Sequence, residues 1–277
     1  MNDSTQTGQP VLSIRLSAKY AGTNDVLREV HLDVGPGEIM GLVGQSGSGK
    51  STLAMALLGL LDTRRCKLSG SIRFQDREML GMSERQLRSL RGRAMALVLQ
   101  SPLTSLNPAL RIRTQLMEAW RAHAPASNQE GEEKLRSALH SVSLPSDKDF
   151  LQKFPSQMSV GQAQRVLIAM AVLHRPALLI ADEATSALDV ITQAEILALF
   201  AKLNRETGTA ILYISHDLAS VAEICHRIAI LHDGQIVECG PRNQIFTEPR
   251  HDYTRRLMAA LPRLPQRPRA AAASASE

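Results

Sequence analysis

Hydrophobic and polar positions follow two different patterns along the chain. They alternate over residues 11–20 and 26–34, which predicts two half-buried antiparallel strands. Segments with helical spacing, such as 50–61 and 192–206, separate the later apolar runs. The pattern predicts an α/β fold with a mostly parallel sheet, helices on both of its faces and an N-terminal antiparallel β subdomain. The short, continuously apolar runs that would form the parallel strands are residues 38–44, 95–100, 177–182, 210–215 and 227–233.

A long stretch in the middle of the chain contains no strong strand pattern. Residues 112–124 and 132–144 have helical spacing there, and prolines punctuate the stretch. We therefore predict an inserted α-helical subdomain that emerges from the α/β core at Ser101 and runs to about Pro155. The insert spans about 101–175 when the helix that begins near Ser159 is included.

The two ends of the chain differ in composition from its centre. We expect residues 11–262 to form one domain together with the insert. The first residues are polar, and the last are rich in alanine and serine. Residues 1–10 and 263–277 are therefore predicted to be flexible tails.

The positive charge of the chain is concentrated near its C-terminus. The net charge is +5, and residues 250–269, with six arginines and one aspartate, account for all of it. A nucleic-acid surface needs basic side chains spread over a folded face, often with aromatic ones between them, and only 3% of the residues are aromatic. We therefore expect no nucleic-acid partner.

The cysteines and the N-terminal residues indicate a reducing compartment and no membrane span. Cys66, Cys225 and Cys239 are far apart in the sequence, so neither a disulfide framework nor a zinc cluster is predicted. The polar N-terminus is unlike a signal peptide, and the apolar runs are shorter than the ~20 residues of a membrane helix. If the protein works at a membrane, another chain must supply the span.

A glycine-rich segment between a predicted strand and a predicted helix has the form of a phosphate-binding loop. It reads GQSGSGKS over residues 44–51, which fits G-x-x-x-x-G-K-[ST]. Glycines let backbone N–H groups surround phosphates, Lys50 reaches the β- and γ-phosphates, and the Ser51 hydroxyl is suited to Mg²⁺. The segment predicts a nucleoside triphosphate site formed by Gly44, Gln45, Ser46, Gly47, Ser48, Gly49, Lys50, Ser51 and Thr52.

Two consecutive carboxylates close the apolar run at 177–182. Asp182 is predicted to hold hydrated Mg²⁺, because the carboxyl edge of a parallel sheet is where α/β proteins bind ligands. Side chains of neighbouring strand residues point apart, so Glu183 is predicted to face the γ-phosphate as general base for the attacking water. A purely structural acidic pair is disfavoured, because burying it without partners is costly.

Two further polar residues follow predicted strands. Gln100 closes the run at 95–100, and its long uncharged side chain is able to contact both Mg²⁺ and water. His216 follows the run at 210–215 and is placed to donate a hydrogen bond to a γ-phosphate oxygen, although a lone histidine is more often structural. Both are candidate catalytic residues, and Gln100 is also a candidate metal ligand.

Residues 158–166 read MSVGQAQRV and begin an apolar helix with many small and hydrogen-bonding residues. One interpretation is simple N-capping, which needs a single Ser, Thr, Asp or Asn. The other is that the exposed N–H groups of this helix bind an anion. The segment by itself leaves both interpretations open.

Together these motifs resemble the ATP-binding-cassette (ABC) ATPases. The resemblance implies a P-loop NTPase core, ATP and Mg²⁺ as cofactors, and hydrolysis of ATP to ADP and phosphate. It also implies that Tyr20 stacks on the adenine, whereas a tyrosine on a strand is otherwise a packing residue. The segments that carry the resemblance, in this order and spacing, are 44–51, Gln100, 159–165, 178–183, 186–189 and His216.

Two more segments resemble the oligopeptide, dipeptide and nickel importer branch of that family. They are LQSPLTSLNP at 99–108 and EPRHDYTRRLMAALP at 248–262. The resemblance implies a subunit that powers uptake of a peptide, nickel or metal-chelate solute. Longer members of the branch continue with cysteines that this chain lacks, so no iron–sulfur cluster is expected. The alternative is a soluble ABC ATPase without a transporter, such as an accessory protein of a phosphonate-degrading complex or a DNA-maintenance ATPase.

The resemblance also implies an assembly. Two ATPase subunits, here expected to be different chains, meet head to tail so that each ATP lies between one phosphate loop and the other chain's signature helix. Ser159, Gly161 and Gln162 would contact the partner's ATP, and Asp189 would cross the same interface. Two transmembrane permease subunits and a periplasmic or extracellular solute-binding protein complete the system. The chain would then lie peripherally on the cytoplasmic face of the inner (plasma) membrane.

One residue departs from the family's usual Leu-Ser-Gly-Gly-Gln run. Val160 stands where the first glycine is usual, so a β-branched side chain lies beside the approaching triphosphate. Valine also resists the positive φ that glycine permits. We expect a weakened contribution to the partner's site and two unequal ATP sites, with the better one around Lys50. The alternative is that Val160 is neutral.

Overall fold

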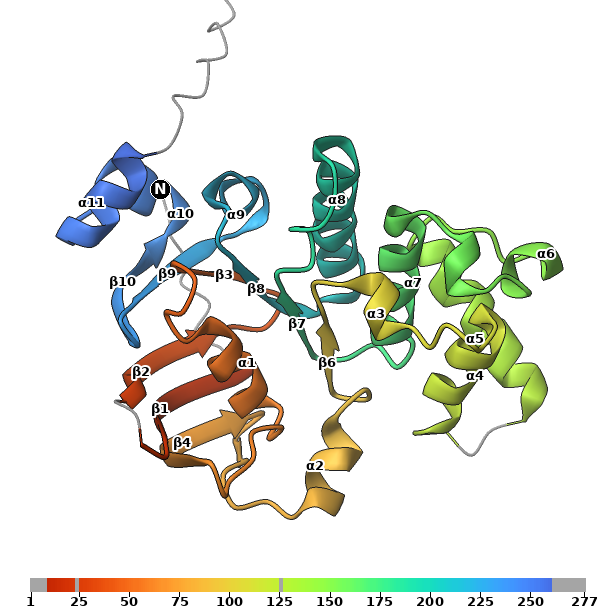
Figure 1. Ribbon diagram of the computed structural model, residues 1–277, viewed down its shortest axis with the longest axis horizontal. Helices are drawn as coiled ribbons and strands as arrows, with labels where there is room; N and C mark the ends of the chain where they lie inside the picture. Colours follow the sequence, from red (N-terminus) through yellow and green to blue (C-terminus); the bar gives the residue numbers. More distant parts are fainter. Residues whose placement is uncertain (1–8, 23–24, 125–126, 261–277) are drawn as a thin grey trace, which may run out of the picture.

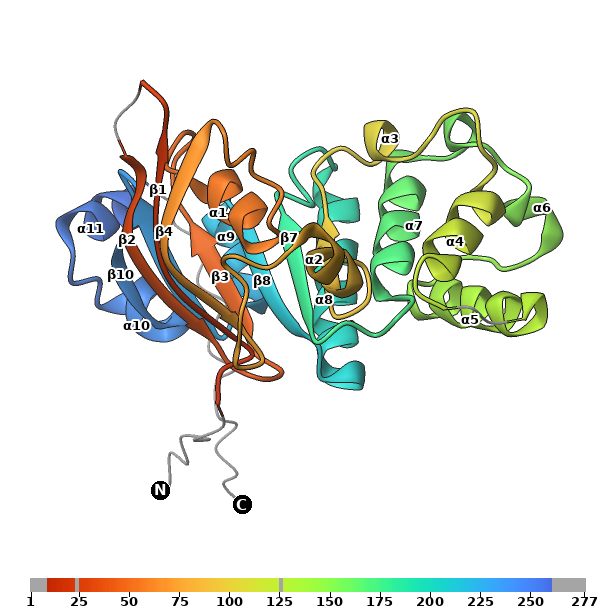
Figure 2. The ribbon, with the colours of Figure 1, turned by 90° about the horizontal axis from the view of Figure 1, so that it is seen from below.

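The computed structural model describes residues 9–22, 25–124 and 127–260. Its strands form a four-stranded and a six-stranded sheet, and a group of helices projects beyond one edge of the larger sheet (Figures 1 and 2). Of the predicted tails, residues 1–8 and 263–277 lie outside the described residues.

The N-terminal alternating segments form the four-stranded antiparallel sheet. β1 (Leu12–Tyr20) pairs with β2 (Asp25–Val34) and with β4 (Cys66–Phe74), and β5 (Arg77–Glu78) lies at the edge. The predicted strand pair is therefore confirmed. The sequence pattern misses β4, because its centre, residues 69–71, reads Ser-Gly-Ser and only its pairing with β1 makes it a strand.

The apolar runs form the six-stranded sheet, in the order β10-β9-β3-β8-β7-β6. Neighbouring strands are parallel except for β10, which returns antiparallel to β9. All residues of β3, β7 and β8 are buried, as expected of strands covered on both faces. The strands are β3 (Ile39–Val43), β6 (Met95–Val98), β7 (Leu178–Asp182), β8 (Ala210–Ser215), β9 (Arg227–His232) and β10 (Gln235–Pro241).

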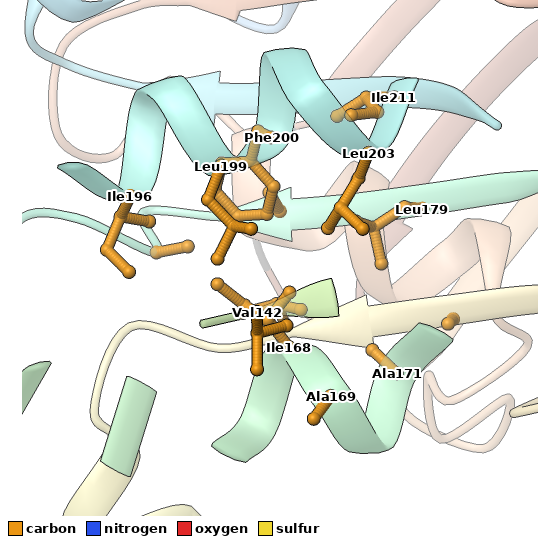
Figure 3. Close-up of a cluster of buried hydrophobic side chains, with 14 of the residues drawn as sticks. Val142, Ile168, Ala169, Ala171, Leu179, Ile196, Leu199, Phe200, Leu203 and Ile211 are labelled. Carbon is orange, nitrogen blue, oxygen red and sulfur yellow. The ribbon is translucent and has the colours of Figure 1, made fainter. Parts of the chain in front are cut away.

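The two faces of this sheet are covered differently. Met40 and Leu42 pack with α1 (Lys50–Leu57) and the antiparallel sheet in one hydrophobic cluster. The other face packs on three helices, α7 (Val160–Val172), α8 (Val190–Thr207) and α9 (Leu218–Ile224). In Figure 3, side chains of α8 such as Phe200 and Leu203 lie against the sheet residues Leu179 and Ile211. The expectation of helices on both faces is therefore confirmed, and on one face α1 shares the cover with the apolar side of the antiparallel sheet.

The remaining helices form the predicted insert and two smaller groups. The predicted segments 112–124 and 132–144 correspond to α4 and α5, and both lie with α6 at the end of the molecule farthest from β1 (Figures 1 and 2). The overall insert boundaries, about 101–175, and the domain limits 11–262 stay predictions. The helices are α2 (Glu84–Leu90), α3 (Pro102–Ser105), α4 (Ile112–Arg121), α5 (Asn128–Ser141), α6 (Lys148–Leu151), the 3₁₀ turn η1 (Pro155–Gln157), α10 (Arg242–Thr247) and α11 (Asp252–Ala259).

The architecture confirms the predicted fold class. A mostly parallel sheet with a glycine-rich loop between β3 and α1 forms the core, an antiparallel β subdomain precedes it, and helices are inserted between β6 and β7. Within the described ranges, no helix has both the length and the apolar character that crossing a bilayer would need.

Candidate functional site

The phosphate loop, residues 44–51, connects β3 to α1 and depends on its glycines. Gly47 and Gly49 have φ values of +80° and +106°, which L side chains rarely adopt. A Cβ on Gly44 would overlap the carbonyl oxygen of Leu231 and lie 2.6 Å from Ser48 Oγ. The start of the loop therefore lies directly on the carboxyl end of β9, where only glycine fits.

Lys50 is buried at the centre of the loop. Only 5% of its surface is exposed, and its Nζ donates hydrogen bonds to the carbonyl oxygens of Gly44 at 2.8 Å and Gln45 at 3.0 Å. Burial lowers the pKa of Lys50, while the nearby carboxylates of Glu183 and Asp182 act in the opposite direction. The ammonium thus lies between the loop and two acids, within reach of an anionic ligand.

Asp182, the last residue of β7, is a buried carboxylate with spare hydrogen-bonding capacity. It is 7% exposed, and its Oδ1 has no hydrogen-bond partner among the described residues. Burial raises the pKa of Asp182, and a hydrogen bond from the Ser51 side chain partly offsets this. An unpartnered carboxylate oxygen beside a hydroxyl is a donor set suited to a hard cation such as Mg²⁺.

Glu183 and His216 form a pair at the same edge of the sheet. The Nδ1 of His216 lies 3.2 Å from Oε1 of Glu183. Glu183 lies just beyond β7 with a φ of +50°, and its N–H donates to the carbonyl oxygen of Ile214 at 2.9 Å. The turn at Glu183, rather than strand alternation, therefore separates its side chain from that of Asp182. Such strained backbone is common at functional sites.

The carboxyl edge of the sheet holds a cavity of about 380 Å³. The first three residues of the phosphate loop, Gly44, Gln45 and Ser46, lie there together with Glu183 and His216. Leu257 of α11 also lines the cavity. It was not predicted from the sequence, because the resemblance of its segment to the importer branch does not indicate where that segment packs. The lining residues are Val43, Gly44, Gln45, Ser46, Glu183, His216 and Leu257.

Lys50, Ser51, Asp182, Gln100 and Tyr20 are not among the residues that line this cavity. Gln100 is exposed and lies two residues beyond the end of β6, so the prediction that it ends a strand is wrong. Tyr20 ends β1 and is partly buried against the core. Its neighbour Lys19 lines a second cavity of about 640 Å³ together with Gly47, which places this end of β1 near the phosphate loop.

The start of α7 has a structural explanation within this chain. Ser159 caps the helix by accepting a hydrogen bond from the N–H of Gln162 at 3.2 Å, and the Gln162 side chain accepts one from the N–H of Ser159 at 3.2 Å. A Cβ on Gly161 would lie 2.7 Å from Thr192 Cγ2 of α8. Capping thus accounts for Ser159 and Gln162, and close packing accounts for Gly161, without a partner chain. These side chains leave the N–H groups of Val160 and Gly161 uncapped.

Val160 is the first residue of α7, and its φ is negative. The predicted conformational cost of valine at this position is therefore wrong, since a helical residue has no need of a positive φ. Its side chain is 38% exposed. What distinguishes Val160 from glycine is the volume of an apolar side chain at the entrance to the helix.

Asp189 caps the following helix, α8. Its Oδ1 accepts hydrogen bonds from the N–H groups of Ile191 at 3.1 Å and Thr192 at 3.0 Å. The Thr192 hydroxyl is the main cause that lowers the pKa of Asp189. The next two residues, Val190 and Ile191, are 81% and 75% exposed. None of Ser159, Gly161, Gln162 and Asp189 is among the residues that line the cavity beside Lys50.

Comparison with known proteins decides the family. Residues 27–186 match the family model described as ABC transporter. The chain belongs to the ABC transporter ATPases. It is accordingly an ATP-hydrolysing subunit of a transport system, and the alternative of an ABC ATPase without a transporter is not favoured.

A second match covers the C-terminal part of this ABC subunit. Residues 237–276 match the oligopeptide/dipeptide transporter, C-terminal region. The dipeptide transport ATP-binding protein DppD of Bacillus subtilis (strain 168) is 39% identical over 246 residues, which are 88% of this chain and 73% of that protein. The oligopeptide transport ATP-binding protein OppD of Salmonella typhimurium (strain LT2) is 42% identical over 243 residues, 88% and 72% of the two chains.

Solved ABC structures have the same fold. The dimeric, post-hydrolysis structure of the ATP-binding cassette MJ0796 bound to ADP and Pi superimposes with a TM-score of 0.72 at 26% identity, covering 83% of this chain and 98% of that one. The structure of cbiO1 from Clostridium perfringens, part of the cbiONQ transporter complex, gives 0.76 at 25% identity, covering 92% and 97%.

Proposed function

We propose that this ABC subunit binds ATP in the cavity beside Lys50 and hydrolyses it to power uptake of a peptide-type solute. The observation that carries the proposal is the meeting of the phosphate loop with the Glu183–His216 pair in one cavity. The peptide class is supported by the names of the relatives and by the matched C-terminal region. A nickel or metal-chelate solute belongs to the same branch as a second candidate.

In this proposal the phosphate loop binds the triphosphate. Backbone N–H groups from Gly44 to Thr52 surround the phosphates, and the Lys50 ammonium exchanges its two carbonyl partners for β- and γ-phosphate oxygens. The free-energy cost of this exchange is small, because the Lys50 ammonium gives up two neutral carbonyl acceptors and gains anionic phosphate oxygens. Tyr20, at the end of β1, stacks on the adenine.

Mg²⁺ would be held by the Ser51 hydroxyl, the Asp182 carboxylate and the Gln100 amide oxygen. The unpartnered Oδ1 of Asp182 fits this role. When bound, the ion neutralises charge on the phosphate oxygens. Gln100 lies on an exposed bend beyond β6, so it would join the site by movement of that bend.

Glu183 is the proposed general base. A carboxylate at the edge of the cavity is placed to accept a proton from the water that attacks the γ-phosphate. His216 orients this carboxylate through Nδ1. When the neutral His216 ring donates from Nδ1 to Glu183, its Nε2 can only accept a hydrogen bond. To donate to a γ-phosphate oxygen as well, His216 must therefore be protonated on both nitrogens or must release Glu183.

The signature helix is proposed to act on the ATP of a second subunit. The uncapped N–H groups at the start of α7 carry partial positive charge suited to a γ-phosphate. Ser159, Gly161 and Gln162 would border that phosphate, and Asp189 would lie at the same interface. Val190 and Ile191 beside Asp189 are adjacent exposed apolar residues, and contiguous exposed apolar surface supports a protein contact there.

The proposed assembly contains a second, different ABC subunit, two transmembrane permease subunits and a periplasmic or extracellular solute-binding protein. The chain would associate peripherally with the cytoplasmic face of the inner membrane through the permeases. The absence of a membrane-spanning helix from the described residues is consistent with this arrangement.

The substitution Glu183→Gln tests the proposal. It preserves size and hydrogen bonding but removes the basic oxygen, so we expect unchanged ATP affinity and a loss of turnover of about 10²- to 10⁴-fold. ATP affinity is measured by fluorescence titration of the purified chain, and turnover as phosphate release by the assembled complex. Lys50→Ala is the matched control, because it should abolish binding itself. Wild-type turnover in the Glu183→Gln complex would reject Glu183 as the base.

A further inference from the structure

His216 lies on the short turn between β8 and α9, and packing does little to fix its side chain. The side chain is 56% exposed, and its Nδ1 lies 3.2 Å from Glu183 Oε1. A ring so open to solvent takes its direction mainly from the backbone that carries it. The precision of the Glu183–His216 pair therefore depends on how firmly this turn is held.

Asp217, the next residue, organises the turn. Its N–H donates to Ser215 Oγ at 2.9 Å, and its carbonyl oxygen accepts a hydrogen bond from the Ser220 hydroxyl at 2.8 Å. Its carboxylate caps α9 by accepting from the N–H groups of Ala219 at 2.9 Å and Ser220 at 3.3 Å. The residues on both sides of His216 are thus bound to each other and to the first turn of α9.

Gln193 reaches this turn from a different helix. It lies in the first turn of α8, and its Nε2 donates to Asp217 Oδ2 at 2.8 Å between two half-buried side chains. A carboxylate oxygen only accepts hydrogen bonds, so the amide must present its NH₂ group here. This bond is shorter than the 3.3 Å bond that the same oxygen accepts from the Ser220 N–H.

The helix that carries Gln193 is itself firmly anchored. Ile196 and Phe200 lie three and seven residues farther along α8, on the same helix face, and both are fully buried (Figure 3). Gln193 therefore continues the buried face of α8 with a polar group that points toward the His216 turn. An anchored donor of this kind restricts the movement of Asp217.

We propose that Gln193 is a positioning residue for ATP hydrolysis, which holds the Asp217 turn so that His216 keeps Glu183 oriented. The contacts run from Gln193 to Asp217, and from the neighbouring His216 to Glu183. The inference rests on the proposed function, in which Glu183 is the general base. Gln193 is not among the described residues that line the cavity, so its loss should slow turnover and spare ATP binding.

Phosphate release by the assembled complex, measured over a range of ATP concentrations, tests the proposal. Gln193→Ala should lower kcat about tenfold, as expected for loss of one hydrogen bond to a charged group, and leave KM within about twofold. Gln193→Glu has the same size but replaces the donor with an oxygen, so it should lower kcat at least as much. If the alanine variant does not fold, the glutamate variant decides. Wild-type kcat in the variants would overturn the proposal.

A double-variant cycle with His216→Ala shows whether Gln193 acts through the histidine. In the His216→Ala complex there is no imidazole left to position, so adding Gln193→Ala should change kcat less than about twofold. Radiolabelled ATP keeps these low rates measurable. An equal tenfold loss in both backgrounds would show that Gln193 acts elsewhere and would overturn the proposal. Lack of ATP hydrolysis by the wild-type complex would instead reject the proposed function, and the inference with it.

Asn204→Ala is the matched control, because it removes another amide donor from the same helix. Asn204 is 6% exposed and donates to the carbonyl oxygens of Gly37 at 3.0 Å and Thr209 at 2.8 Å, at the far end of α8 from Gln193. We expect a lower melting temperature and a kcat within about twofold of the wild type. The same behaviour in Gln193→Ala would show a purely structural role and overturn the proposal.

Discussion

Among single residues, Asp182 shows most clearly that a group suited to function can lower the stability of the fold. Burial raises its pKa above the ordinary value of 3.8, so the folded chain holds this proton more tightly than the unfolded chain. Ionisation of Asp182 therefore lowers the free energy of unfolding once the pH exceeds the ordinary pKa of the unfolded chain. The loss reaches its full size when the pH is above the raised pKa of the folded chain. A bound cation would offset that cost, which is consistent with a Mg²⁺ ligand.

Asp182→Asn is therefore expected to raise the melting temperature of the nucleotide-free chain at pH 7. The difference from the wild type should shrink as the pH falls through the raised pKa of Asp182, because the wild-type side chain then becomes neutral as well. Adding Mg²⁺ and ATP should stabilise the variant less than the wild type. Thermal unfolding with and without ligand measures both effects, and an unchanged melting temperature at pH 7 would contradict the assigned cost.

Val160 illustrates how a helical conformation changes the reasoning about one residue. Its φ is negative, so only the side-chain volume distinguishes it from glycine in the proposed contact with a partner's ATP. Val160→Ala should then act like Val160→Gly, and both should raise the ATPase rate of the assembled complex or leave it unchanged. Phosphate release compares the three proteins. A strong fall in either variant would show that the valine is required.

At the scale of elements, the contact between α7 and α8 is set by Gly161. A Cβ there would lie 2.7 Å from Thr192 Cγ2, so a side chain at this position requires Thr192 or one of the helices to shift. This contact connects the start of the signature helix to the helix that Asp189 caps. The two segments proposed to meet the partner subunit therefore contact each other at this point.

Gly161→Ala should destabilise the chain by about 1–3 kcal/mol, the usual cost of overpacking a tight contact. Thr192→Ser removes the clashing methyl group and keeps the hydroxyl that donates to Asp189 at 2.6 Å. The double variant should recover most of the lost stability, measured by denaturant unfolding. Equal stability of Gly161→Ala and the wild type would mean that the helices move apart without cost.

At the scale of the whole molecule, the basic C-terminal residues are expected to be separable from the ATP site. Among the described residues, those that line the cavity beside Lys50 all precede residue 258, and residues 263–277 lie outside the described part of the chain. Deleting 263–277 should leave ATP affinity within about twofold of the wild type. Fluorescence titration of the shortened chain tests this, and a large loss of affinity would place these residues in the site.

Much of the fold and the site could be predicted from local sequence. The phosphate loop, Asp182, Glu183 and His216 are recognisable because each follows a short apolar run, and the carboxyl ends of parallel strands meet at one edge. β4 and β10 escaped prediction, because their strand character comes from pairing with β1 and β9 rather than from a clear alternation of their own.

The family, the triphosphate loop and most strands and helices could be recognised from sequence alone, since these depend on residue types at short spacing, whereas β4 and β10 could not. Which distant segments share the site follows from how the folded elements pack. Leu257 lies roughly two hundred residues after the loop, and the anchoring of α11 on β10 brings it to the cavity. Contacts of that kind depend on how elements pack, and no local pattern encodes them.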